Sequence, residues 1–173
     1  MAVIARKKTH TFQAQGRAFR TIYYTIAWIQ TLTALICLIG QTTGIFFYDW
    51  AAHYGLQEHR EEVGPSIVQV NRAFCTSDTI LYIPILISSA YGLFQKKRCW
   101  SLICTAASAG VHSHWAITVA FILLSLDKND IEGYTRHVPA EIWSFIGFYL
   151  VYGILVLEFL YYYWDILFVV TMY

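Results

Sequence analysis

Two apolar runs joined by a short basic turn decide the fold of this chain: CTSDTILYIPILISSAYGLF (75–94), QKKRC (95–99) and WSLICTAASAGVHSHWAITVAFILL (100–124). Each run is long enough to cross the roughly 30 Å apolar core of a bilayer as a helix. Lipid offers no partner to a free backbone amide, so such a segment must form an α-helix. Because the turn is so short, the two helices must be antiparallel neighbours.

Two further apolar runs flank this hairpin, one before it and one after it. We therefore predict an all-α fold, a four-helix transmembrane bundle that forms a single multi-pass domain over residues 1–173. The predicted spans are about 23–46, 75–94, 100–124 and 142–170. A transmembrane barrel would instead need short strands of alternating polarity. The last run is longer than a perpendicular helix requires, which predicts tilt or protrusion from the membrane.

Composition supports the membrane assignment and narrows the function classes. Apolar residues make up 57% of the chain and charged residues 13%, whereas about a quarter of the residues in a soluble domain are charged. The basic residues flank the apolar runs and form no broad face, so nucleic acid is not an expected partner. The four cysteines form no CxxC pair, and we expect no metal site and no cofactor.

The distribution of Lys and Arg predicts the orientation of the bundle. Eight basic residues lie in the N-terminal segment and the turn at 95–98: Arg6, Lys7, Lys8, Arg17, Arg20, Lys96, Lys97 and Arg98. The segments 47–74 and 125–141 hold the other four: Arg60, Arg72, Lys128 and Arg136. We predict that both termini are cytoplasmic. The 47–74 segment should form interfacial or short helical structure over the outer mouth, with a break at Gly64-Pro65.

Ionisable residues inside a predicted span are the first candidates for a functional site, because charge is costly in lipid. Asp78 lies in the outer half of the second run, where it could hold the charge of a ligand or could simply be an acid at a helix start beside Thr76 and Ser77. His112 and His114 lie at a similar depth in the third run, but two residues apart they point about 200° away from each other. We expect His112 to come within hydrogen-bond or water-bridged reach of Asp78.

The first run is unusually polar for a membrane span, with Gln30, Thr33 and Gln41 among its residues. Such side chains suit hydrogen bonds between helices or the lining of a cavity. A transmembrane haem would need facing histidines on two helices, and only the third run carries them, so haem is not expected.

The hairpin resembles the EXPERA-domain superfamily, the emopamil-binding-protein and sigma-2-receptor-like membrane proteins. The similarity lies in an acid six residues before a proline (Asp78 to Pro84), an Ala-Tyr-x-x-Phe ending (90–94), a basic turn with Arg-Cys-Trp (98–100) and a third helix with Val-His-Ser-His (111–114). It covers residues 75–124 well.

The resemblance implies a four-helix fold and a sterol-related ligand. The sigma-2 branch binds cationic amphiphiles with two membrane carboxylates, of which Asp78 matches the second and Asp49 is the candidate for the first. The sterol isomerase branch has a His four residues before the second-helix acid. This chain has Phe74 there, a departure that argues against isomerase chemistry.

These observations predict a membrane protein that binds a sterol-like or amphiphilic lipid ligand inside its helix bundle. The expected ligand-binding residues are Asp78, His112, His114, Asp49, Tyr82 and Trp115. One alternative is a structural or accessory subunit of a larger membrane complex, with partner membrane subunits. A second is a sterol isomerase-like enzyme, although an enzyme is the less favoured class. The implied location is the endoplasmic reticulum in a eukaryote, or the inner membrane in a bacterium.

Overall fold

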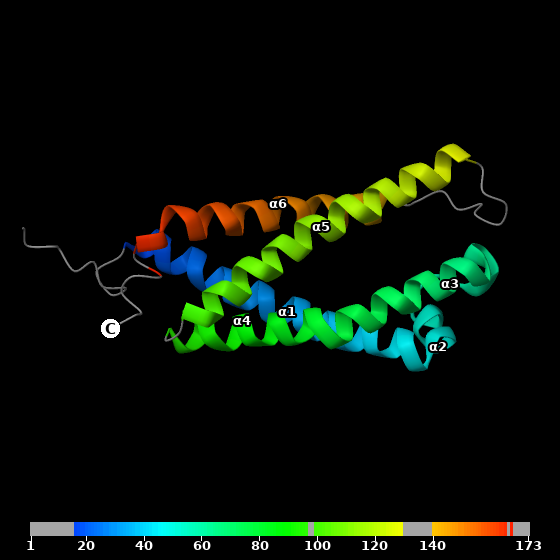
Figure 1. The fold of residues 1–173 in the computed structure, drawn as a ribbon, viewed down its shortest axis with the longest axis horizontal. Helices are drawn as coiled ribbons and strands as arrows, with labels where there is room; N and C mark the ends of the chain where they lie inside the picture. The colour runs from blue at the N-terminus through cyan, green and yellow to red at the C-terminus, as the bar shows by residue number, and fades with distance from the viewer. Residues whose placement is uncertain (1–15, 97–98, 130–139, 166, 168–173) are drawn as a thin grey trace, which may run out of the picture.

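The computed structural model describes residues 16–96, 99–129, 140–165 and 167, and these residues are helical almost throughout, with no strand among them. In chain order the elements are α1 (Arg17–Phe46), α2 (Tyr48–His53), α3 (Arg60–Ser77), the π-helical turn η2 (Asp78–Tyr82), α4 (Ile83–Gln95), α5 (Cys99–Asn129) and α6 (Ala140–Tyr162). Figure 1 shows them as one elongated bundle.

Four helical stretches are long and apolar enough to cross a membrane: Arg17–Phe46, Arg60–Gln95, Cys99–Ser125 and Ile142–Tyr162. The predicted all-α, four-helix class is therefore confirmed, and the chain is an integral, multi-pass membrane protein. α5 packs against both α4 and α6, while α1 packs against α3 and α4.

The second membrane helix begins much earlier than predicted. α3, η2 and α4 follow one another from Arg60 to Gln95 with a kink at Gly64, so the short helical structure expected within 47–74 is present and part of it continues into the second span. Polar side chains before residue 75 break the apolar run, although the backbone there is helical. The apolar run alone therefore did not show where the helix begins. The predicted break is present at Gly64, whose φ of 72° lies in the left-handed region.

The start of α1 and the end of α6 lie at the same end of the bundle, here called the terminal end; the opposite end, which carries α2, is the far end (Figure 1). Near the start of α1, the Phe19 ring packs 5.4 Å from the Phe159 ring and 4.7 Å from the Tyr163 ring. The described residues nearest the two termini therefore lie on one side, as predicted, and the cytoplasmic identity of that side stays a prediction. The part of the 142–170 run after residue 167 lies outside the described residues.

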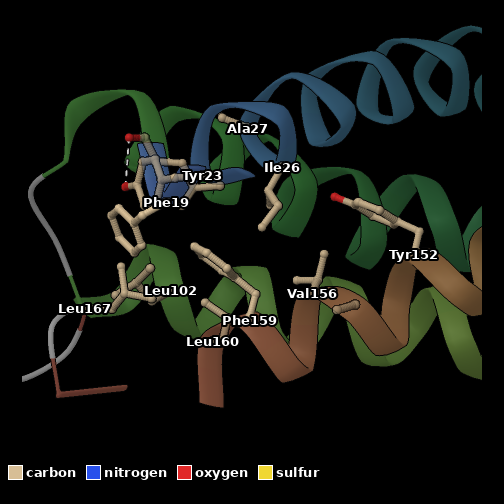
Figure 2. Close-up of a cluster of buried hydrophobic side chains, with 12 residues drawn as sticks. Phe19, Tyr23, Ile26, Ala27, Leu102, Tyr152, Val156, Phe159, Leu160 and Leu167 are labelled. Carbon is tan, nitrogen blue, oxygen red and sulfur yellow. Dashed lines mark hydrogen bonds between the residues drawn. The ribbon is translucent and has the colours of Figure 1, made fainter. Parts of the chain in front are cut away.

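The helices pack through an apolar core and through a close approach at a glycine. Figure 2 shows the apolar core near the terminal end, where Ile26 of α1 lies opposite Val156 and Phe159 of α6. A Cβ atom at Gly153 of α6 would lie 2.6 Å from the Ala109 carbonyl oxygen of α5, so a glycine permits this close approach.

Polar side chains of the first span do bridge helices, as predicted. The buried Gln30 amide donates to the Ser108 hydroxyl of α5 at 2.8 Å. The Thr33 and Tyr149 hydroxyls lie 3.4 Å apart and join α1 to α6. Inside lipid such bonds replace contacts that water would otherwise supply.

Candidate ligand-binding cavity

A cavity of about 300 Å³, here called the central cavity, lies among α1, η2, α5 and α6. Its volume is at the lower end of the range typical of small-molecule sites. Its lining includes Thr33, Ile36 and Cys37 from α1, Asp78 and Tyr82 from η2, His112 and Trp115 from α5, and Phe145 and Tyr149 from α6.

Pro84 explains the π-helical turn of the second membrane helix beside the central cavity. A proline has no N–H to donate, and its ring clashes with the carbonyl four residues earlier. In the turn before it, the Ile83 N–H bonds the Asp78 carbonyl oxygen, five residues back, which makes η2 a π-helical turn. Asp78 and Tyr82, at the two ends of this turn, both line the central cavity. Single π-helical turns of this kind are frequent at functional sites.

The Asp78 carboxylate lies half-buried in the cavity wall and makes no hydrogen bond or ion pair within the described part of the chain. The helix runs continuously through Thr76 and Ser77, so Asp78 is not an acid at a helix start. A carboxylate inside a membrane span normally faces a partner or a water-filled space. The Asp78 carboxylate is therefore available to bind a ligand in this cavity.

A hydrogen bond between Tyr82 and His112 closes one side of the cavity. The Tyr82 hydroxyl lies 2.7 Å from His112 Nε2, and His112 Nδ1 lies 2.6 Å from the Ser108 carbonyl oxygen. A carbonyl can only accept, so Nδ1 carries a hydrogen and, in a neutral ring, Nε2 accepts from Tyr82. The imidazole also stacks on the Tyr149 ring, with centroids 4.8 Å apart.

Of the two histidines, only His112 lines the central cavity, and its expected hydrogen bond to Asp78 is absent among the described residues. His112 is buried in the cavity wall, whereas His114 is exposed on the opposite face of α5 and does not line the cavity. No hydrogen bond joins Asp78 to either histidine among the described residues. In His112, Tyr82 and Ser108 occupy both ring nitrogens. A water-bridged pairing stays a prediction.

Asp49 is not brought to this cavity. It lies on α2 at the far end, its side chain is 74% exposed, and its carboxylate pairs with Arg60. Sequence reasoning placed it beside the end of the first span but could not foresee that α2 turns its side chain away from Asp78. Tyr82 and Trp115, by contrast, do line the cavity.

A second cavity of about 460 Å³, here called the side groove, adjoins the central cavity and shares Asp78, Trp115 and Phe145 with it. It runs along α3 toward the far end, where α3 and α5 diverge in Figure 1. Its walls are mainly apolar, with Ile67, Val70 and Phe74 on one side and Val119, Ile122 and Leu123 on the other. Asp78 thus stands at the junction of the two spaces.

The lining residues that were missed from the sequence include Cys37, Phe145 and Tyr149. Aromatic residues occur on every face of α6, so their pattern does not show which face turns inward. The polar positions Thr33 and Gln41 were recognisable as cavity candidates, and both line it.

Together these features define a multi-pass membrane protein with an internal cavity, whose aromatic and apolar walls surround one carboxylate that has no partner among the described residues. Such a space can accept an apolar molecule that carries a cationic or hydroxyl group. Comparison with protein-family models, with curated proteins and with solved structures found no match.

Proposed function

We propose that this protein binds a sterol-like or amphiphilic molecule in the central cavity, with Asp78 as the polar anchor. One observation carries the proposal: a carboxylate inside a membrane helix faces an apolar cavity and has no partner among the described residues. A charged group near the middle of a span costs about 2.5–3.5 kcal/mol on insertion scales. A ligand amine or hydroxyl would offset that cost.

The walls of the cavity suit the remainder of such a ligand. Trp115, Phe145 and Tyr149 offer aromatic faces, which attract a cation by about 0.5–2 kcal/mol and pack against an apolar ring system. The side groove supplies an apolar path for a ring skeleton or chain longer than the central cavity. The resemblance to EXPERA-domain proteins points to the same ligand class.

Equilibrium binding of two probes with one skeleton tests the proposal: cholesterol and its 3-amino analogue, titrated into the full-length chain in detergent. We expect Asp78→Asn to weaken binding of the amine by about tenfold or more, equivalent to about 1.4 kcal/mol. The matched control is Glu158→Gln, which removes a carboxylate from the exposed face of α6. Equal affinities of the wild-type chain and Asp78→Asn for both probes would overturn the proposal.

Cysteine alkylation provides a second readout that needs no labelled ligand. Cys37 lines the central cavity, whereas Cys104 on α5 lies outside it. Bound amine should slow the reaction of Cys37 with a membrane-permeant maleimide and leave that of Cys104 unchanged. Equal rates with and without the probe would contradict occupancy of this cavity.

The two alternative functions are an accessory subunit of a larger membrane complex and a sterol isomerase-like enzyme. An accessory subunit of a larger complex would need partner helices, and the exposed apolar side chains of the bundle suit lipid and partner helices equally. Stoichiometric co-purification of another membrane protein would favour that function. We do not extend the proposal to isomerase catalysis, because both ring nitrogens of His112 are engaged inside the protein.

A further inference from the structure

A separate hollow of about 340 Å³, here called the corner hollow, lies at the far end where α1 passes into α2. It shares no lining residue with the central cavity. Its lining combines the aromatic residues Phe46, Phe47 and Trp50 with the charged residues Asp49, Arg60 and Arg72. Aromatic rings and arginines gathered in one hollow are the components of a site for an amphiphile with an anionic head.

The two arginines reach the hollow from different parts of α3 and keep most of their donors open. The Arg60 Nε donates to Asp49, and the Arg72 Nη2 donates to the Ile45 carbonyl oxygen at 3.0 Å. Each guanidinium has five N–H donors, so each uses one in these bonds to described residues. With two cations and one carboxylate, the hollow has a net charge of +1.

Tyr48 adds no charge to the hollow. Its ring lies 5.4 Å from the Arg60 guanidinium carbon, and Asn71 donates to its hydroxyl at 3.2 Å. Burial raises the pKa of the Tyr48 hydroxyl above its ordinary value, so the group stays protonated near neutral pH. Tyr48 therefore does not itself offset the charge of the two arginines, while the Glu58 carboxylate, which is outside the lining, accepts a hydrogen bond from the same Asn71 amide at 3.0 Å.

The aromatic rim is exposed at a depth suited to lipid headgroups. Phe46 and Phe47 are 70% and 66% exposed, and Trp50 is 49% exposed. α1 has 30 residues and is therefore about 45 Å long, which exceeds the apolar core of a bilayer and carries its end into the headgroup layer. Exposed aromatic rings concentrate at this level of membrane proteins.

We propose that the corner hollow binds the phosphodiester headgroup of a phospholipid. Arg60 and Arg72 donate to the phosphate oxygens, a geometry for which the planar guanidinium is well suited. Phe46, Phe47 and Trp50 contact the glycerol and the start of the acyl chains. A free phosphate ion would meet the same arginines but would leave the aromatic rim unused. The inference is independent of the ligand proposed for the central cavity.

Native mass spectrometry of the full-length chain in detergent tests this site with four probes. They are phosphatidylglycerol, phosphatidylcholine and diacylglycerol with matched acyl chains, and inorganic phosphate as a competitor. We expect both phospholipids to bind at least about tenfold more tightly than diacylglycerol, since only they carry the phosphate. Inorganic phosphate at equal concentration should not displace them.

The arginines are tested by the double variant Arg60→Gln with Arg72→Gln, and the matched control is Arg17→Gln with Arg20→Gln at the terminal end. We expect about a tenfold loss of phospholipid affinity in the first pair and no loss in the control. Asp49→Asn keeps both arginines and raises the net charge of the hollow from +1 to +2, so it should strengthen phosphatidylglycerol binding about two- to fivefold. This variant also tests the site if the double variant fails to fold.

Three results would overturn the proposal. Diacylglycerol could bind as tightly as the phospholipids, or inorganic phosphate could displace them at equal concentration, which would indicate an anion site without lipid specificity. Alternatively, Asp49→Asn and the double arginine variant could both leave phospholipid affinity at the wild-type value.

Discussion

The Tyr82 hydroxyl and His112 Nε2 lie 2.7 Å apart and join the π-helical turn η2 to α5 at the edge of the central cavity. Asp78, at the other end of the same turn, has no such partner among the described residues. η2 therefore places two polar side chains in the wall of the central cavity. The Tyr82 hydroxyl is hydrogen-bonded, and the Asp78 carboxylate has no hydrogen bond to a described residue.

Replacing Tyr82 by Phe removes this hydrogen bond and leaves the buried His112 without its donor. We expect a loss of about 0.6–2 kcal/mol in the free energy of unfolding, the range for a bond between membrane helices and for a buried group left unsatisfied. Tyr91→Phe is the control, because Tyr91 is exposed on α4. Denaturant unfolding in detergent measures both. In a cycle with His112→Leu, strictly additive effects would mean that the two residues are not coupled.

Asp78→Asn should not destabilise the protein without ligand. The substitution keeps the shape of the side chain, removes a carboxylate from a membrane helix and breaks no bond to a described residue. We expect the free energy of unfolding to stay unchanged or to rise by up to about 1 kcal/mol, which corresponds to about 2–4 °C in a chain of this size. Thermal unfolding in detergent measures this. A clear drop in melting temperature would reveal a stabilising partner of the carboxylate.

Gly153→Ala should separate α6 from α5. The added Cβ would lie 2.6 Å from the Ala109 carbonyl oxygen and would also contact the Ser113 hydroxyl. Relief of the first contact would require a shift of the α5 backbone. We expect a loss of about 1–3 kcal/mol, the usual effect of overpacking. Gly147→Ala on the same helix is the control, since no atom lies within 4 Å of its Cβ position. There the higher helix propensity of alanine predicts no loss, and equal destabilisation by both changes would contradict the packing argument.

The cytoplasmic assignment of the terminal end can be tested by charge. Neutralising Lys96, Lys97 and Arg98 together should weaken the orientation bias, because positive charge in short connections holds them on the cytoplasmic side. Residues 97 and 98 lie outside the described part of the structure. A tag on each connection, read by its accessibility in sealed vesicles, measures the outcome. Unchanged accessibility would mean that the N-terminal basic cluster alone sets the orientation.

The composition and the apolar runs by themselves determined that the chain is an all-α membrane protein with four spans. Lipid leaves no backbone group unpaired, so run length translates almost directly into helix number. The short basic turn also determined that the second and third spans are antiparallel, which placed Asp78 and His112 at a similar depth.

Only the tertiary structure decided which side chains face one another. The helical continuation from Pro65 to Ser77 was hidden because polar side chains interrupt the apolar run without ending the helix. The pairing of His112 with Tyr82 in place of Asp78, and the turning of Asp49 toward Arg60, depend on how each helix is rotated about its axis. In a membrane helix the lipid-facing surface is as apolar as the packed one, so hydrophobic periodicity carries little information about that rotation.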